Sequence, residues 1–269
     1  MSDLGQFQLS GKAAENYEKI PARYILGPWA TGLVEAADIQ PDENVLDVAC
    51  GTGLVTRTAA AKLGPQGRIT GLDLNEGMLE VARNLATTGA AQPTWIRNSA
   101  LDMELPDGGF DVVLCQQGLQ FFPDQQQALL ETHRVLHDRG RACFSIWAGK
   151  GAYNIVLADA IAAYINEGAA EQYLKPREVP DIDTLKALFT GAGFRQVNVT
   201  HMEMQVRLPE IETFIIAHLL GTPMAEALEQ LSAREQAALA SYAAEKLSAY
   251  ADGLDAVVPD AVNLVLAQK

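Results

Sequence analysis

The residues best suited to chemistry lie in one glycine-rich stretch, Val45-Leu46-Asp47-Val48-Ala49-Cys50-Gly51-Thr52-Gly53, which runs from an apolar segment into a helical one. The small residues at positions 49, 51 and 53 allow the backbone to approach a ligand closely. A helix that begins there presents unpaired N–H groups and the positive end of its dipole, and Asp47 contributes a negative charge. This combination favours a ligand with both a carboxylate and an ammonium group over a pyrophosphate.

A second acidic residue, Asp73, ends the next apolar run, Gly71-Leu72-Asp73-Leu74. A carboxylate at the end of the second strand of a nucleotide-binding sheet can accept hydrogen bonds from both hydroxyls of a ribose. A glycine-rich turn alone is a weak sign of such a site. The turn combined with Asp47 before it and Asp73 after the next strand is a strong one.

These residues need a framework, and the hydrophobic pattern supplies it. Short apolar runs typical of strands occupy 44–48, 68–72, 94–97, 110–115 and 141–147, and helical patterns separate them over 54–63, after Asn75 and over 129–136. Such alternation predicts an α/β fold, in which helices cover both faces of a mostly parallel sheet.

The two ends of the chain depart from this alternation. Residues 11–37 are predicted to form two helices broken at Gly27-Pro28, because proline cannot continue a helix. In the strand predicted over 197–206 the apolar alternation slips, which indicates a bulge or a strand end near His201. Residues 210–252 are predicted to be helical, and 261–267 to form a last strand.

Composition excludes several classes of function. The 269 residues carry a formal net charge of -14 without a Lys/Arg cluster, so we expect neither a nucleic-acid partner nor an anionic membrane surface. No apolar run is long enough for a membrane span, and Met1 to Lys12 lacks a signal-peptide pattern, so a cytoplasmic location is predicted. The three cysteines form no CxxC pair, and no metal is expected.

Four stretches carry a resemblance to a known family: VLDVACGTG, GLDLNEGML, SALDMELPDGGFDVVLCQQGLQFFPD and RVLHDRGRACFSIW. They resemble the successive motifs of class I S-adenosylmethionine-dependent methyltransferases, most closely the type 11 or UbiE-like branch, over about residues 40–200. The resemblance implies a seven-stranded Rossmann-like sheet, mostly parallel with an antiparallel last strand. It also implies four parts: N-terminal helices covering the active site (1–40), a cofactor-binding core (41–209), a helical lid insertion (210–255) and the last core strand (256–269).

The resemblance also implies a cofactor site. Asp47, Ala49, Gly51 and Gly53 would surround the methionine part of S-adenosylmethionine, and Gln116 would close the site near its amine. Asp73 would hold the ribose hydroxyls. The residues around the adenine would be Leu74, Met78, Ser99, Ala100 and Leu101. The sequence departs from the family's pattern twice, since Ala49 replaces the more usual glycine and Ser99 stands where many members have an aspartate.

The acceptor pocket is less well defined. Tyr17, Tyr24, Trp29 and Trp147 could line it, since aromatic faces suit a sulfonium cation, although core packing explains them as well. An apolar acceptor would be matched by side chains of the predicted lid region: Met202, Met204, Phe214, Ile215, Leu219 and Leu220. Core packing is again the alternative.

The reaction expected is in-line displacement at the sulfonium methyl, with S-adenosylhomocysteine as product and a small molecule as the O-, N- or C-methyl acceptor. His201 and His218 are the weak candidates for a general base. Two other functions stay open: a non-catalytic S-adenosylmethionine-binding regulator and an NAD-dependent Rossmann enzyme. The glycine pattern, which is not GxGxxG, counts against the second. A homodimer is also left open.

Overall fold

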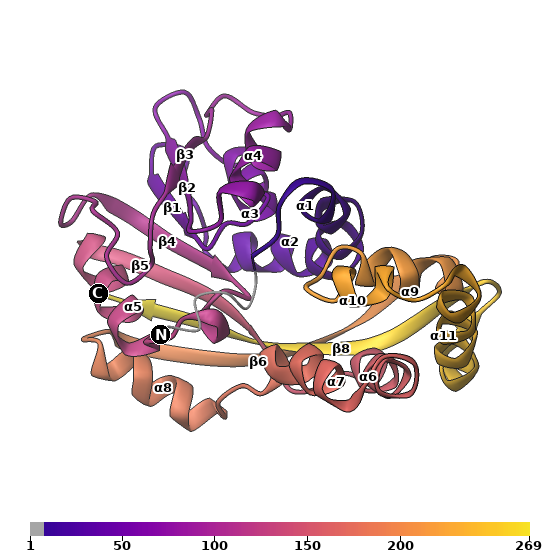
Figure 1. Ribbon diagram of the computed structural model, residues 1–269. Helices are drawn as coiled ribbons and strands as arrows, with labels where there is room; N and C mark the ends of the chain where they lie inside the picture. The colour runs from indigo at the N-terminus through magenta and orange to yellow at the C-terminus, as the bar shows by residue number, and fades with distance from the viewer. Residues whose placement is uncertain (1–7) are drawn as a thin grey trace.

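The computed structural model describes residues 8–269 and contains one mixed sheet with strand order β3-β2-β1-β4-β5-β8-β6 (Figure 1). The strands are β1 (Asn44–Val48), β2 (Arg68–Asp73), β3 (Thr94–Arg97), β4 (Phe110–Gln116), β5 (Leu136–Trp147), β6 (Arg195–Leu208), β7 (Ala251–Asp252) and β8 (Asp255–Gln268). Strands β1 to β5 are parallel, whereas β8 runs antiparallel between β5 and β6. The predicted fold class is confirmed, including the antiparallel last strand.

Helices cover both faces because the apolar residues of the strands point both ways. In β1, Leu46 and Val48 pack into a buried cluster with α5 (Gln125–Val135) and α8 (Ile182–Gly191). Val45 packs on the opposite face, with α2 (Gly27–Ala36) and α3 (Leu54–Ala60). The helix α4 (Glu76–Asn84) follows β2 and is capped by Asn75, whose side chain accepts from Gly77 N.

The expected break at Gly27-Pro28 is wrong. One continuous helical segment is formed by α1 (Gly11–Tyr17), the π-helical η1 (Glu18–Leu26) and α2. Gly27 has a helical φ of -55° and donates to Ala22 O, five residues back. This wide turn carries the helix into α2, where Pro28 occupies the first turn and its missing N–H costs little.

The expected irregularity near His201 is also wrong. The register between β6 and β8 is regular from Asn198 to Leu208, and it shifts only between Arg195 and Asn198. The apolar side chains switch from one face of β6 to the other because different hydrophobic clusters cover the two ends of this long strand. Val197 and Val199 pack with the cluster that contains α8, whereas Met202, Met204 and Val206 pack with the cluster at the other end of the molecule.

Three helices lie between β6 and β8 in the chain, where the sequence predicted a helical segment: α9 (Ile211–Leu219), α10 (Ala225–Glu229) and α11 (Ala233–Lys246). A capping box of Ser232 and Glu235 starts α11. Helix α11 lies at the far end of the long β6–β8 pair, and α9 lies nearer α1 and α2 (Figure 1). Short 3-10 turns are η2 (Leu119–Phe121), η3 (Lys175–Arg177) and η4 (Ser248–Tyr250).

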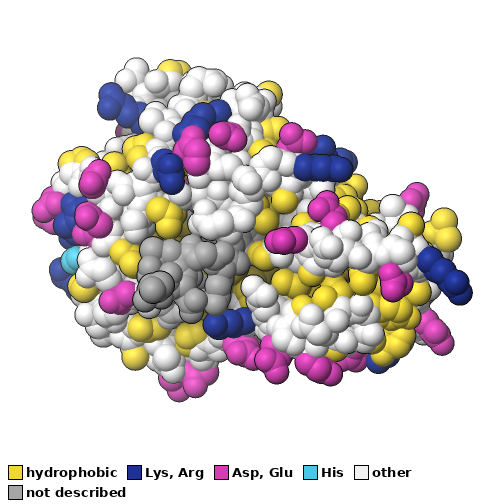
Figure 2. Space-filling view, in the orientation of Figure 1, with side chains coloured by type: hydrophobic (Ala, Val, Ile, Leu, Met, Phe, Trp, Pro, Cys, Tyr) yellow, Lys and Arg dark blue, Asp and Glu magenta, His cyan; other side chains and the backbone are white. Residues whose placement is uncertain are grey.

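A second pair of helices, α6 (Ala152–Tyr164) and α7 (Glu167–Leu174), follows β5 and packs with α9 and α11 in one hydrophobic cluster. Helices of the described residues are too short or too polar to cross a membrane. On the face drawn in Figure 2, Lys and Arg side chains are scattered among acidic ones and form no basic patch.

Candidate active site

A cavity of about 390 Å³ opens at the carboxyl ends of the parallel strands. Ala49 and Gly51 reach it from the loop after β1, and Asp73, Gln116 and Trp147 from the ends of β2, β4 and β5. Open α/β sheets bind ligands at this edge, because the loops that follow neighbouring strands meet there. One cavity therefore collects residues that are about a hundred positions apart in the sequence.

The glycine-rich loop takes a backbone course that favours glycine. Ala49 and Gly51 both have a φ of +55°, and Gly53 has +81° as the N-cap of α3. A Cβ on Gly53 would lie 2.3 Å from the Trp95 ring, so only glycine fits there. Ala49 adopts the left-handed conformation without being a glycine, and this costs roughly 1–2 kcal/mol.

The structure brings Ala49 and Gly51 to the cavity, but not Asp47 or Gly53. Asp47 is buried beneath the loop, where its Oδ2 accepts a hydrogen bond of 2.6 Å from Thr56 Oγ1 of α3. Burial raises the pKa of Asp47 to about 7, and the neighbouring charge of Asp73 acts in the same direction. In the structure these two positions shape the loop, and their contact with the methionine part stays a prediction.

Asp73 holds the loop and still faces the cavity. Its Oδ2 accepts from Gly51 N at 2.7 Å and its Oδ1 from Asn75 N at 2.8 Å. Burial raises the pKa of this carboxyl above its ordinary value. Each carboxylate oxygen can accept two hydrogen bonds, so the carboxylate keeps acceptor capacity for a diol. The Asn75 Nδ2 group beside it is buried and has no hydrogen-bond partner among the described residues.

The predicted adenine-side residues also line the cavity: Leu74, Met78, Ser99, Ala100 and Leu101. Their loop is tied down locally, since Ser99 Oγ accepts from Leu101 N at 3.1 Å and Leu101 O accepts from Gln127 Nε2. The backbone of Leu101 is thus already engaged, which leaves that of Ala100 for a ligand.

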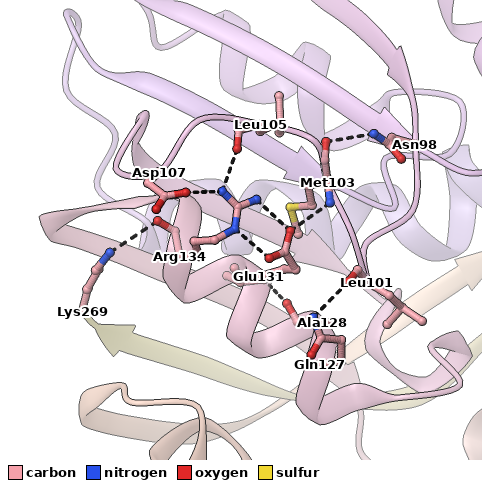
Figure 3. Close-up of polar contacts among 11 residues, drawn as sticks. Asn98, Leu101, Met103, Leu105, Asp107, Gln127, Ala128, Glu131, Arg134 and Lys269 are labelled. Carbon is pink, nitrogen blue, oxygen red and sulfur yellow. Dashed lines mark hydrogen bonds and ion pairs between the residues drawn. The ribbon is translucent and has the colours of Figure 1, made fainter.

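Helix α5 fixes the rest of this loop (Figure 3). Glu131 accepts from Met103 N at 2.9 Å, and Arg134 donates to Leu105 O at 2.7 Å while pairing with Glu131. Asn98 Nδ2 donates to Met103 O. These contacts hold the segment from 98 to 107 against α5, so the adenine-side wall is rigid before any ligand binds.

The aromatic candidates divide into two groups. Tyr17 lines the cavity, and its ring lies 3.9 Å from the place where a Cβ on Gly51 would sit. Trp147 also lines it. Tyr24 packs edge-on against Phe214, and Trp29 is buried in the same cluster, so neither reaches the cavity. Core packing also accounts for the six apolar residues of the predicted lid region, none of which lines the cavity.

The side-chain amide of Gln116, predicted to close the site near the cofactor's amine, is already engaged in the structure, because its Nε2 donates to Leu26 O at 2.9 Å. The following residue, Gln117, presents an amide that no described residue satisfies. Both line the cavity.

The two histidines differ in their positions. His218 lines the cavity, is buried, and shares a hydrogen bond of 2.6 Å between its Nδ1 and the Tyr153 hydroxyl. Burial, with a smaller contribution from Arg177, lowers the pKa of His218 to about 3, so the ring is neutral at physiological pH. His201 lies half-exposed on β6 between Asn263 and Glu203 and does not line the cavity.

Several cavity residues were missed from the sequence. Arg177 lies over the Trp147 ring, 3.6 Å from its centroid, and forms two hydrogen bonds with Asp260, at 2.7 and 3.1 Å. Tyr173 donates to Asn154 Oδ1 at 3.1 Å. The loop after β4 adds Phe121 and Phe122, and the stretch after α9 adds Thr222, Pro223 and Met224. For Phe121 and Phe122, their position just after the carboxyl end of β4 was the available signal.

Comparison with known proteins decides the family. A methyltransferase-domain family model matches residues 45–140. The ubiquinone/menaquinone biosynthesis C-methyltransferase UbiE of Ectopseudomonas mendocina (strain ymp) is 30% identical over 226 residues, which cover 74% of this chain and 88% of that protein. The chain belongs to the class I S-adenosylmethionine-dependent methyltransferases of UbiE-like type.

Solved structures share the fold of this methyltransferase at low identity. The protein BH2331 of Bacillus halodurans C-125 is 19% identical, with a TM-score of 0.55, and the match covers 89% of this chain and 98% of that one. The phosphoethanolamine N-methyltransferase 2 of Haemonchus contortus, solved with phosphomonomethylethanolamine and S-adenosylhomocysteine, is also 19% identical with a TM-score of 0.56, covering 90% of this chain and 52% of that one. Among the described residues of this chain, no group of three or more His, Cys, Asp or Glu side chains could hold a metal ion.

Proposed function

We propose that this methyltransferase transfers a methyl group to a small, flat, uncharged molecule whose ring carries hydroxyl or carbonyl oxygens, of the quinol class. The observation that carries the proposal is the lining of the cavity. Asp73 is its one acidic residue among those described, and eight carboxamide side chains also line it. They are Gln8, Asn75, Asn98, Gln116, Gln117, Gln120, Asn154 and Gln172.

The charges of the lining argue against ionic acceptors. An amine would be favoured by a carboxylate on the acceptor side, but Asp73 stands on the opposite side, at the end of β2. A phosphate would be favoured by free cations, but Arg177 is neutralised by Asp260, which leaves exposed Lys175. Neutral hydroxyl and carbonyl groups match carboxamides, and aromatic rings at Trp147, Tyr173 and Phe122 match a flat ring. The UbiE relative is a ubiquinone/menaquinone biosynthesis C-methyltransferase, which supports the same class of acceptor.

The residues on the other side fit the cofactor. We assign the ribose diol to the remaining acceptor positions of Asp73, with the orphaned Asn75 Nδ2 donating beside it. Leu74 and Met78 would pack on the adenine, and Ala49 and Gly51 leave room for the methionine part. S-adenosylmethionine, when bound, supplies an electrophilic methyl group and leaves as S-adenosylhomocysteine, and the neutral acceptor releases one proton to solvent as it is methylated.

Positioning is then the main contribution of the protein. Holding the acceptor atom in line with the methyl group can account for ~7–11 kcal/mol of the barrier. A neutral His218 with a pKa of about 3 is a poor base, so His218 does not compete with this explanation. The tied adenine loop and the loop bonds of Asp73 supply the rigidity that positioning requires.

The segments that close the cavity are part of the proposal. Tyr17, Pro21, Ile25 and Leu26 bring the N-terminal helices over the site. Of the predicted lid, His218 and residues 222–224 reach the cavity, whereas α11 packs on α6 and α9. We therefore propose residues 218–224 as the covering part. A cytoplasmic location and a homodimer remain predictions.

Formation of S-adenosylhomocysteine with a panel of acceptors tests the function. The panel contains a reduced 1,4-naphthoquinol with one prenyl group, phosphoethanolamine, a primary arylamine and no acceptor. The naphthoquinol should give the highest kcat/KM. A higher value with phosphoethanolamine or the amine would contradict the proposal.

A further inference from the structure

Gln117 is the first residue after β4, and its side-chain amide is buried but forms no hydrogen bond with a described residue. The residue is 6% exposed, lines the cavity, and neither its Nε2 nor its Oε1 has a hydrogen-bond partner among the described residues. The preceding Gln116 offers a contrast, because its amide is bonded to Leu26 O. A buried amide without partners carries a desolvation cost, so a polar ligand at this point would relieve it.

The backbone of Gln117 is held in place by neighbours on both sides. Its φ is +49°, its N–H donates to Ser145 O of β5 at 2.8 Å, and its carbonyl accepts from Gln120 Nε2 at 2.8 Å. The next residue, Gly118, has no room for a side chain, since a Cβ would lie 2.8 Å from Ala49 Cβ and 2.7 Å from Cys115 Sγ. The amide is therefore presented by a fixed loop.

This loop lies between the two sides of the cavity. Gly118 touches Ala49 of the glycine-rich loop, and Gln117 is bonded to Ser145, two residues before Trp147. The bond to β5 places Gln117 on the side of Trp147 and away from Asp73 on β2. A second unsatisfied acceptor, Gln120 Oε1, belongs to the same loop.

We propose that the Gln117 carboxamide is the group that binds a ring oxygen of the methyl acceptor and sets its position relative to the cofactor. The amide can donate from Nε2 and accept at Oε1, which matches a ring hydroxyl or a carbonyl beside one. The methionine moiety is a poorer match for this position, because the bond from Gln117 N to Ser145 O holds the residue on the β5 side of the cavity, toward Trp147. This inference rests on the proposed function, since it takes a neutral oxygenated ring as the acceptor.

The test replaces Gln117 with methionine, which keeps the length of the side chain and removes both polar atoms. Gln196→Met is the matched control, because Gln196 has the same φ of +49° but is exposed on β6 outside the cavity. Binding of the reduced prenyl-1,4-naphthoquinol to protein saturated with S-adenosylhomocysteine is measured by calorimetry, together with KM, kcat and the Kd of S-adenosylhomocysteine.

Gln117→Met should weaken naphthoquinol binding and raise its KM by tenfold or more, with the Kd of S-adenosylhomocysteine within twofold of the parent. Because an unsatisfied amide is removed, the Tm of the ligand-free variant should not fall, and a rise of about 2–4 °C is expected. Gln196→Met should change none of these values. The parent should also bind the naphthoquinol at least tenfold tighter than its dimethyl ether, and the variant should discriminate much less.

Three outcomes would overturn the assignment. A tenfold loss of S-adenosylhomocysteine affinity in Gln117→Met would show that the amide binds the cofactor. Equal naphthoquinol binding by parent and variant would remove Gln117 from the acceptor site while leaving the proposed function intact. A parent protein that does not bind the naphthoquinol would contradict the proposed function and, with it, this assignment. Should Gln117→Met fail to fold, Gln117→Asn, which withdraws the amide by one methylene, is read in the same way.

Discussion

Replacement of Asp73 by asparagine separates the two roles that the structure gives this carboxylate. In the ligand-free protein it accepts from Gly51 N at 2.7 Å and Asn75 N at 2.8 Å. In the complex we expect it to accept from the ribose diol as well. Asparagine keeps the shape but turns an NH₂ group toward one of these donors, so one loop bond and one diol bond are lost together.

The two losses have different sizes. A hydrogen bond to a charged group contributes about 1.5–3 kcal/mol, so losing the diol bond at ~2 kcal/mol weakens S-adenosylhomocysteine binding about thirtyfold. The loop bond is lost from the folded protein, but removal of a buried charge offsets it, because burial raises the pKa of Asp73 and so disfavours the carboxylate. The Tm should therefore fall by less than about 5 °C.

Isothermal calorimetry and thermal melts measure the two effects. Asp183→Asn on the exposed first turn of α8 is the control, and it should leave both unchanged. Unchanged affinity in Asp73→Asn would refute the ribose assignment. A large fall in Tm with a proportionate loss of affinity would show that Asp73 acts only through the loop.

Four further predictions follow from the same site. Asp47→Asn should stabilise the protein more at pH 8 than at pH 4. The carboxyl of Asp47 has a pKa of about 7 in the folded state against 3.8 in the unfolded state, so it contributes at most ~4 kcal/mol of stability below pH 4, and this contribution is lost as the pH rises through 7. Denaturant melts at both pH values check this, and equal gains would contradict it. His218→Asn should lower kcat less than about tenfold, and the parent kcat should show no His218 inflection between pH 6 and 9; a loss near a thousandfold would reveal a base. Trp147→Ala should raise the acceptor KM more than His201→Ala does, since only Trp147 lines the cavity, and steady-state kinetics with the naphthoquinol decides. Glu18→Gln breaks the 2.6 Å pair with Arg57 that ties η1 to α3 beside the bond from Thr52 of the glycine-rich loop. Hydrogen exchange over 11–26 and the off-rate of S-adenosylhomocysteine should both rise severalfold, and unchanged exchange would count against a covering role.

The cofactor side of the cavity could be predicted from the sequence because it depends on local patterns. An apolar run, a glycine-rich turn and Asp73 at the end of the following run lie within 30 residues. Their positions in space follow from the rule that parallel strands end at one edge. The surroundings of Asp47 were not predictable, because the alternation of a strand indicates which face a side chain leaves but not that Thr56 Oγ1 bonds to it there.

The acceptor side could not be predicted in the same way. Arg177, Tyr173 and Asn154 come from helices whose packing on the sheet depends on contacts with β8 and α9. The π-helical course of η1 also removed the expected break, since Gly27 bonds five residues back and Pro28 has no N–H to lose in the first turn of α2. The unsatisfied amide of Gln117 is a property of burial, which no spacing in the sequence reveals.

Methyl transfer itself is the most direct test of the central claim, that this cavity joins S-adenosylmethionine to a neutral oxygenated ring. The protein is incubated with methyl-labelled S-adenosylmethionine, the reduced prenyl-1,4-naphthoquinol, and a cell extract as a source of competing protein and RNA. We predict that the label enters the solvent-extractable naphthoquinol fraction, that it depends on the enzyme, and that Asp73→Asn slows it at subsaturating cofactor. Label that appears in protein, RNA or phosphoethanolamine in preference to the naphthoquinol would contradict the account.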